Sequence, residues 1–283
     1  MSNVLSARDK AIKALADAFR RQHPDVALNP KGYARDFRDT LLPRVSPEDF
    51  KEDLLSGDGN ELEEKFRAAH SSSGLGVNCF APFRQRIGDL VLPGNSAFNA
   101  LEFERKCPTG LRGGRAPNLD IVLSGLTSMV AIESKLTEYL LTESPSIRQA
   151  KFSHAYQEQI RDARRKQGYF REMLRLQNRP DHYIWLDAAQ LIKHAFGLAR
   201  TFPDRPVTLL YLFWEPLNPD ADSEFARHRD EIKDFKTRVA GSLPRFEAMS
   251  YPELWRFWRG SASVPGWLHE HLNNLERRYL VSI

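Results

Sequence analysis

Cysteine is scarce in this chain. Only Cys79 and Cys107 occur among 283 residues, and their spacing forms no CxxC pair. Two thiols cannot build a disulfide framework or a four-cysteine zinc site. Small folds that depend on several disulfides or on cysteine-bound zinc are therefore excluded. A reducing compartment suits such a chain, and we expect a cytoplasmic protein.

Long hydrophobic runs are also missing. The apolar stretch at residues 207–214 has the length of a strand, whereas a helix that crosses a bilayer needs about 20 apolar residues. Residues 1–23 are charged and amphipathic, unlike a secretory signal. We therefore expect no membrane segment and no membrane partner.

Repeats and low-complexity tracts are absent, and no Pro-rich linker divides the chain. Hydrophobic residues make up 41% of the sequence, which is enough for one packed core. We expect a single domain over residues 1–283. Its parts are a helical extension at 1–57, a central core at 58–215 and a second helical extension at 216–283.

The hydrophobic periodicity changes along the chain from helix to strand and back. Alternation and short apolar runs predict strands at 101–104, 119–123, 129–136 and 207–214. Apolar spacings of three and four predict helices at 1–23, 47–70, 145–178, 186–200, 222–239 and 251–280, with a break near 57–60. Strands interspersed with helices predict an α/β fold.

Positive charge is concentrated in one segment. The net charge is only +4, but residues 148–179 hold nine Lys or Arg against three acids. Such a stretch suits phosphate contacts along a nucleic acid, although a solvated helix face has the same composition. The candidates for phosphate contact, which include two arginines of the Gly-rich loop 110–115, are Arg112, Arg115, Arg161, Arg164, Arg165 and Lys166.

Two of the predicted strands form a hairpin whose register follows from the sequence. A four-residue loop joins them and places Leu123 opposite Val130. The same register sets Asp120 directly opposite Glu133, where paired Cβ atoms stand roughly 5 Å apart. Strand alternation places Lys135 on that same face.

Two bare carboxylates at this separation would repel each other, so a positive group is expected between them. Mg²⁺ suits the gap because it binds few carboxylates and keeps water ligands, and Mn²⁺ is expected to substitute. The metal would activate a water and neutralise charge on a phosphate, while Lys135 would help to position that water. The structural alternative is a plain salt bridge between Lys135 and one acid, but three buried ionisable groups are costly without a ligand.

The Glu-X-Lys spacing alone discriminates little, because it recurs in the chain, for example at residues 104–106 and 231–233. The copy at residues 231–233 falls in a charge-rich helical stretch, where a solvated surface explains it. The copy at residues 104–106, with Asp89 fifteen residues before Glu104, is a second arrangement of an active motif. Asp89 does not lie in a strand that a short loop joins to a second strand, whereas Asp120 does. We therefore favour the pair of Asp120 and Glu133. Glu104 can still contribute from the neighbouring strand.

At these residues the chain resembles the PD-(D/E)XK, or restriction-endonuclease-like, nuclease superfamily. The match is Pro117-Asn118-Leu119-Asp120 followed by Ile132-Glu133-Ser134-Lys135, with two residues between the proline and the aspartate where the family motif has none. The resemblance covers roughly residues 58–215. It implies a mixed central sheet flanked by helices, Mg²⁺ bound by Asp120, Glu133 and the Ser134 main-chain carbonyl, and Lys135 acting on the attacking water.

Members of this superfamily often add an acid from the helix before the sheet. Glu61, Glu63 and Glu64 are candidates here, and we choose Glu61, although an ordinary surface ion pair explains Glu61 nearly as well. Gln190 resembles the accessory glutamine of the family, and a polar residue that merely flanks an apolar stripe is the equal alternative. Residues 71–78, rich in Ser and Gly, are expected to form a loop that either ends a helix or approaches a phosphate.

The sequence favours a metal-dependent endonuclease that hydrolyses DNA, with RNA as an open alternative substrate. A catalytically inactive nucleic-acid-binding protein of the same fold is the second hypothesis, and the intact Asp120, Glu133 and Lys135 argue against it. Acid–base hydrolysis of another substrate explains neither Lys135 nor the basic segment as naturally. Nothing in the sequence specifies an interface, so a homodimer stays open, and fold-level analogy does not assign a biological role.

Overall fold

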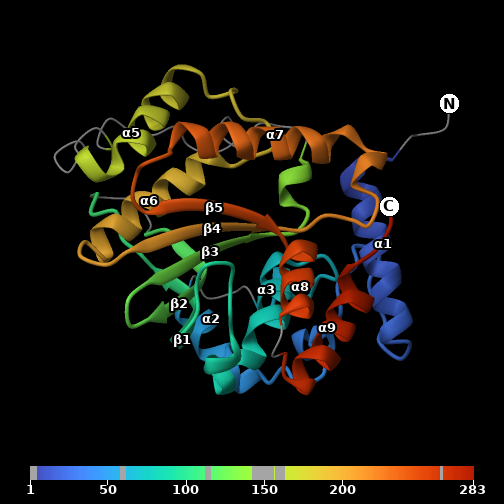
Figure 1. Cartoon of the computed structure of the whole chain (residues 1–283). Helices are drawn as coiled ribbons and strands as arrows, with labels where there is room; N and C mark the ends of the chain where they lie inside the picture. The colour runs from blue at the N-terminus through green and yellow to red at the C-terminus, as the bar shows by residue number, and fades with distance from the viewer. Residues whose placement is uncertain (1–4, 58–61, 112–115, 142–155, 157–162, 262–263) are drawn as a thin grey trace.

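The computed structural model describes residues 5–57, 62–111, 116–141, 156, 163–261 and 264–283. Within these residues, five strands form one mixed sheet in the order β1-β2-β3-β4-β5 (Figure 1). The strands are β1 (Phe98–Lys106), β2 (Asn118–Gly125), β3 (Met129–Lys135), β4 (Val207–Phe213) and β5 (Arg245–Ser250). β1, β2 and β3 are antiparallel neighbours, whereas β4 and β5 continue the sheet parallel to β3.

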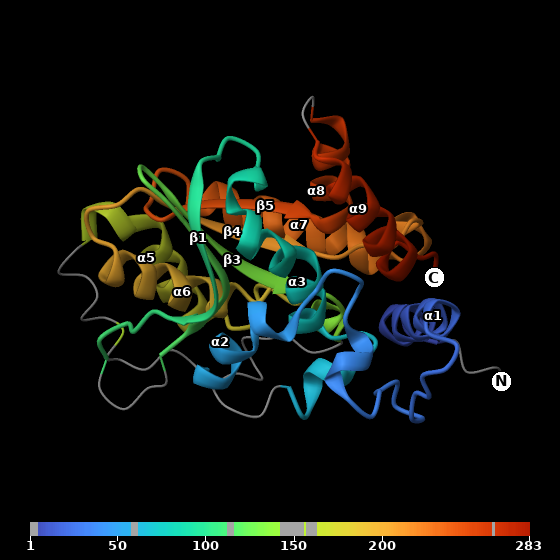
Figure 2. The same ribbon diagram turned by 90° about the horizontal axis from the view of Figure 1, so that it is seen from below.

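Helices cover both faces of this sheet (Figures 1 and 2). The helices on one face are α5 (Ala163–Asn178), α6 (Ala188–Thr201) and α7 (Ser223–Arg238). Those on the other face are α2 (Lys51–Ser56) and α3 (Ser72–Phe80). Three more helices pack together beside the sheet: α1 (Ala7–Gln22), α8 (Tyr251–Gly260) and α9 (Gly266–Tyr279).

Short 3-10 segments connect several of these elements. They are Phe37–Thr40, Pro47–Asp49, Lys65–Arg67, Ala81–Asp89, Glu138–Leu140 and Pro219–Ala221. The core lies on both sides of the sheet and includes the fully buried indoles of Trp214, Trp255 and Trp258. Among the helices that the structure describes, none combines the length and the apolar character that crossing a bilayer requires.

The predicted fold class, an α/β fold with a mixed sheet between helices, is confirmed. The predicted hairpin register is confirmed for the four pairs from Ser124–Met129 to Ile121–Ile132. The predicted next pair, Asp120 with Glu133, is not formed, because the two strands part beyond Ile121 and Ile132. β4 is buried along nearly its whole length, and burial on both faces explains its continuous apolar sequence.

Residues 71–78 differ from their prediction, because they enter α3 and form no loop. The Ser71 hydroxyl accepts a hydrogen bond from the Gly74 N–H at 3.1 Å and so caps the helix. Gly76 brings the helix close to the sheet, where an added Cβ would stand 3.5 Å from Ile121 Cδ1. Packing on the sheet outweighs the low helix propensity of this Ser/Gly-rich stretch.

Two further expectations need correction. The helix predicted at 47–70 is reduced to α2 and the two 3-10 turns that flank it in sequence. The segment at 216–283, expected to be helical, also contributes β5 to the sheet. In β5 the three consecutive residues 247–249 are all half-buried. Buried and exposed side chains therefore do not alternate clearly along this strand, and its sequence does not sustain the alternation of apolar and polar residues that predicts a strand.

Candidate active site

The sheet opens between β2 and β3 at one end. Backbone pairing between these strands ends at Ile121 and Ile132. Beyond that point β2 stays paired with β1 as far as Asn118, and β3 stays paired with β4 as far as Lys135. The strands therefore part inside the sheet, and a cleft of about 720 Å³ lies at the opening.

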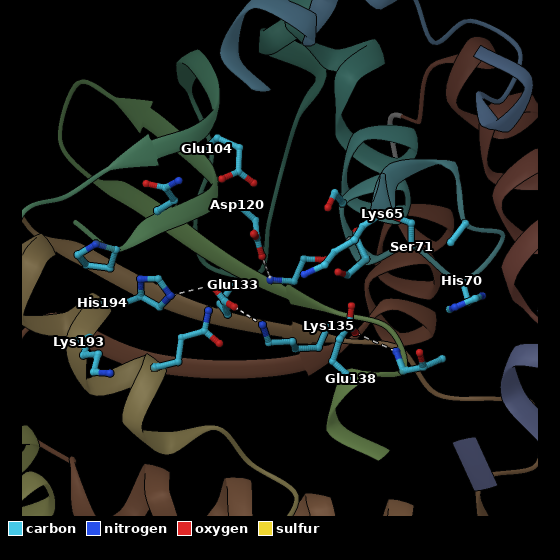
Figure 3. A pocket seen from close by; sticks show the side chains of 18 of the residues that line it. Lys65, His70, Ser71, Glu104, Asp120, Glu133, Lys135, Glu138, Lys193 and His194 are labelled. Atoms are coloured by element: carbon cyan, nitrogen blue, oxygen red, sulfur yellow. Dashed lines mark hydrogen bonds and ion pairs between the residues drawn. The ribbon is translucent and has the colours of Figure 1, made fainter. Parts of the chain in front are cut away.

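Charged side chains of both signs line this cleft (Figure 3). The acids are Glu104, Asp120, Glu133 and Glu138. The basic residues are Arg8, Lys65, His70, Lys135, Lys193 and His194. In Figure 3 the acids of β1, β2 and β3 occupy the middle, with the start of α3 on one side and α6 on the other.

Asp120 enters the cleft from β2. Its Oδ2 accepts a hydrogen bond from the Ser134 backbone N–H at 2.6 Å, so the side chain bridges the point where the strands part. Burial raises the pKa of Asp120 well above its ordinary value, and the charges of Glu133 and Glu104 raise it further. A cation beside Asp120 would stabilise its ionised form.

Glu133 lies between two basic groups. It is 1% exposed, one of its carboxylate oxygens contacts Lys135 Nζ, and the other lies 2.9 Å from His194 Nε2. Burial alone would raise the pKa of Glu133, but Lys135 and His194 outweigh burial and hold this pKa at about 2. Burial likewise opposes the charge of Lys135, and Glu133 and Asp120 nevertheless raise its pKa above the ordinary value. At neutral pH the pair is a carboxylate and an ammonium.

Glu104 reaches the cleft from β1. Its φ of 49° lies in the left-handed region, where residues other than glycine are uncommon and strain often accompanies function. The alternative motif at residues 104–106 is not assembled. Lys106 donates to backbone carbonyls at the end of α2, and Asp89 accepts a hydrogen bond from Trp267 Nε1 at 2.9 Å.

Five of the residues predicted for the site line the cleft together: Asp120, Glu133, Ser134, Lys135 and Gln190. Gln190 stands in the first turn of α6, where its N–H donates to the capping carboxylate of Asp187 at 2.9 Å. Glu61 lies outside the described residues. Within the described chain, Glu104 joins the predicted residues in the cleft, whereas Glu64 does not line it.

The structure tests few of the predicted phosphate contacts. Arg112, Arg115 and Arg161 lie outside the described residues, as do the side chains of Arg164 and Arg165 on α5. Lys166 is 4% exposed and lines a separate hollow beside Phe202 and Pro203. A buried ammonium is not presented to a polynucleotide, so this burial argues against the predicted contact. Counting charge along a segment does not reveal which helix face each charge occupies.

His194 is a site residue that the sequence pattern does not single out. It lies in the largely apolar helix α6, where a histidine has the appearance of an ordinary core residue. One signal was present, because His194 follows Gln190 by four residues and therefore lies one turn along the same helix face. Two polar residues at that spacing on an otherwise apolar helix indicate a shared polar neighbour.

Oxygen ligands for a hard divalent cation are present but are not gathered into a cage. Among the residues that the structure describes, no three His, Cys, Asp or Glu side chains form a ready metal site. Both oxygens of Glu133 face basic groups instead. Asp120 nevertheless stands among acids whose charges disfavour its own ionisation, and a cation would relieve that repulsion. Asp120 and Glu133 are carboxylates, the type of ligand that Mg²⁺ binds, and Glu133 would have to exchange a basic partner for the ion.

A mixed sheet that opens beside two acids and a lysine places the protein in the restriction-endonuclease-like class. Residues 13–280 match the family model described as Restriction Endonuclease associating with ARP. The chain belongs to this family, and membership indicates a nuclease-like role. No curated protein and no solved structure shows a match to the chain.

Proposed function

We propose that the protein is a Mg²⁺-dependent endonuclease that hydrolyses phosphodiester bonds of DNA. The observation that carries the proposal is the meeting of Asp120, Glu133 and Lys135 in one cleft, where β2 and β3 part. When bound, Mg²⁺ would supply an activated water and neutralise charge on the cleaved phosphate. Asp120, Glu133 and the Ser134 carbonyl are the proposed ligands, and Glu104 extends the acidic set.

Lys135 has the position and the charge to act on an anionic phosphate. Its side chain is 16% exposed, so the ammonium stays at the wall of the cleft while it contacts Glu133. A cation fixed there favours negative charge that develops on phosphate oxygens, and it can orient the attacking water. Gln190 faces the same space and offers an amide for the same task.

A second candidate is a nucleic-acid-binding protein of this fold that has no catalytic activity. The observation that favours it is the contact of Glu133 with both Lys135 and His194, which compensates the buried carboxylate without a metal. Both candidates use the same cleft. They differ in whether bound DNA is cut.

Cleavage of supercoiled plasmid separates the candidates. We expect the wild-type protein to nick or linearise plasmid in Mg²⁺ and to be inactive in EDTA. Lys135→Ala should lower the cleavage rate by roughly 100-fold, because it removes a preorganised positive charge. Lys233→Ala is the matched control, since it removes the lysine of the same Glu-X-Lys spacing from an exposed position of α7.

Each outcome of this assay has a defined meaning. Binding without cleavage in both Mg²⁺ and Mn²⁺ would favour the inactive candidate. Equal rates for Lys135→Ala and Lys233→Ala would remove Lys135 from the mechanism. Cleavage of an RNA substrate in preference to plasmid would reassign the nucleic acid.

A further inference from the structure

One end of the cleft is bounded by residues that are remote in sequence from the acidic motif. Arg8, Tyr33 and His70 line this end, next to Ser71 at the start of α3. In Figure 3 His70 lies beyond Ser71, on the side away from Asp120. This end of the cleft is therefore separate from the place where cleavage is proposed.

Arg8 carries a buried donor that no residue in the described part of the chain uses. Its Nε is buried and has no hydrogen-bond partner among the described residues. Arg8 also stands in the first turn of α1, where the partial positive charge of a helix start disfavours a cation. Buried polar groups are normally hydrogen-bonded, so the position of Arg8 suits a partner that comes from outside the chain.

A second arginine, Arg278, also acts on His70 through its positive charge. Arg278 is 1% exposed and donates to two backbone carbonyls, Leu15 O at 3.0 Å and Ala69 O at 2.7 Å. Burial lowers the pKa of His70, and the charges of Arg8 and Arg278 lower it further. His70 Nδ1 is also buried without a hydrogen-bond partner in the described chain.

The acid in this region is already engaged. Glu138 acts on His70 through its charge, but its carboxylate accepts the backbone N–H groups of Leu136 at 2.9 Å and Thr137 at 3.0 Å. Two arginines and one acid therefore act on His70 through their charges, and the acid is bonded elsewhere. Excess positive charge together with buried, unused ring and guanidinium nitrogens is the chemistry of an anion site.

We infer that Arg8 and His70 form a second phosphate subsite, which holds a backbone phosphate of DNA at a distance from the bond that is cut. The inference rests on the proposed function for its ligand, because a polynucleotide is an anion long enough to reach both ends of one cleft. Contacts to backbone phosphates fix the register of a strand without reading its sequence. This subsite places the DNA near α1. The positive charge of residues 148–179 instead predicted that the DNA contacts α5.

The salt dependence of DNA binding tests the subsite in the absence of cleavage. Fluorescence anisotropy of a labelled duplex in EDTA gives the affinity at several KCl concentrations. Loss of one phosphate contact should reduce the log–log slope by about 0.9, so Arg8→Gln should show that reduction and bind roughly tenfold more weakly at low salt. Arg8→Lys should keep the slope. Lys13→Ala, an exposed cation on the same helix, should keep both slope and affinity.

His70→Asn supplies an independent variant on a different element, and it should weaken binding severalfold even if Arg8→Gln folds poorly. Wild-type affinity and slope in folded Arg8→Gln, or wild-type affinity in His70→Asn, would overturn the subsite. Failure of the wild-type protein to bind DNA would overturn it as well. A reduced slope in Arg8→Gln together with no cleavage by the wild type in Mg²⁺ would remove the proposed nuclease function and leave the subsite in place.

Discussion

At the scale of single residues, the two acids of the site have opposite environments. Burial and neighbouring acids raise the pKa of Asp120, whereas Lys135 and His194 hold the pKa of Glu133 at about 2. In active sites, neighbouring acids whose environments shift their pKa values in opposite directions commonly have different functions in the reaction. Glu133 is already compensated by the protein, and Asp120 is the acid that a cation would stabilise most.

We expect His194 to affect the cleavage rate through its contact with Glu133. Its Nε2 lies 2.9 Å from the carboxylate, so His194→Ala leaves one oxygen of a buried charge without its fixed neighbour. We expect the turnover rate on plasmid to fall by about 10–100-fold with little change in KM. His194→Asn should recover part of the rate, because its amide can donate to Glu133. His269→Ala, at an exposed position of α9, is the control; a wild-type rate in His194→Ala would contradict this role.

At the scale of elements, α6 brings Gln190 and His194 to the cleft, and its position depends on Gly197. A Cβ at this glycine would lie 2.1 Å from the Cys107 carbonyl oxygen, so the helix crosses that backbone only without a side chain. Gly→Ala inside a helix usually stabilises by about 1 kcal/mol. Here the sign should reverse, and Gly197→Ala should lower the free energy of unfolding by about 1–3 kcal/mol.

Urea denaturation measures this difference, with Gly260→Ala as the matched control. Gly260 ends α8 and has open space around its Cα, so alanine there should be neutral or stabilising. A Gly197→Ala variant that is as stable as Gly260→Ala would show that α6 can shift without cost. Cleavage by Gly197→Ala should fall together with its stability, since the same helix positions His194.

The sequence predicted those elements in which one physical signal dominates. The apolar run of β4 and the short loop between β2 and β3 sufficed for the strand and the hairpin register, and that register brought Asp120, Glu133 and Lys135 together. The sequence did not predict α3 and β5, because the stability of these elements comes from tertiary packing more than from local composition. Arg8 reaches the cleft only through the fold, so no local pattern could reveal it, and His194 left only its spacing of four residues from Gln190.

At the scale of the whole molecule, two buried histidines make stability depend on pH. His228 is fully buried, with Nε2 3.0 Å from the Tyr211 hydroxyl and its ring stacked on Tyr139. Burial lowers the pKa of His228 to about 3 and that of His271 to about 4. An unfolded histidine titrates near pH 6.5. At these two sites the unfolded chain therefore binds more protons than the folded one at intermediate pH, and their contribution to stability falls as the pH decreases from about 6.5.

Denaturation at stepped pH tests this dependence. The free energy of unfolding should decrease by roughly 1 kcal/mol per pH unit for each histidine between about pH 6 and pH 4. His228→Gln should remove one histidine's share of that slope, whereas His269→Gln, at an exposed position, should not. A slope that is the same in wild type and His228→Gln would contradict the assignment of a neutral buried imidazole.

Acids that meet at the opening between β2 and β3 should make DNA cleavage depend on a divalent cation. A single-turnover measurement of DNA cleavage across a Mg²⁺ titration, for wild type and Asp120→Asn, tests it most directly. The wild-type rate should rise from zero to a plateau, and Asp120→Asn should be slower by roughly 100-fold at every Mg²⁺ concentration while it unfolds at no lower temperature than wild type. Wild-type cleavage that persists in EDTA, or an Asp120→Asn variant that cuts at the wild-type rate, would contradict the claim.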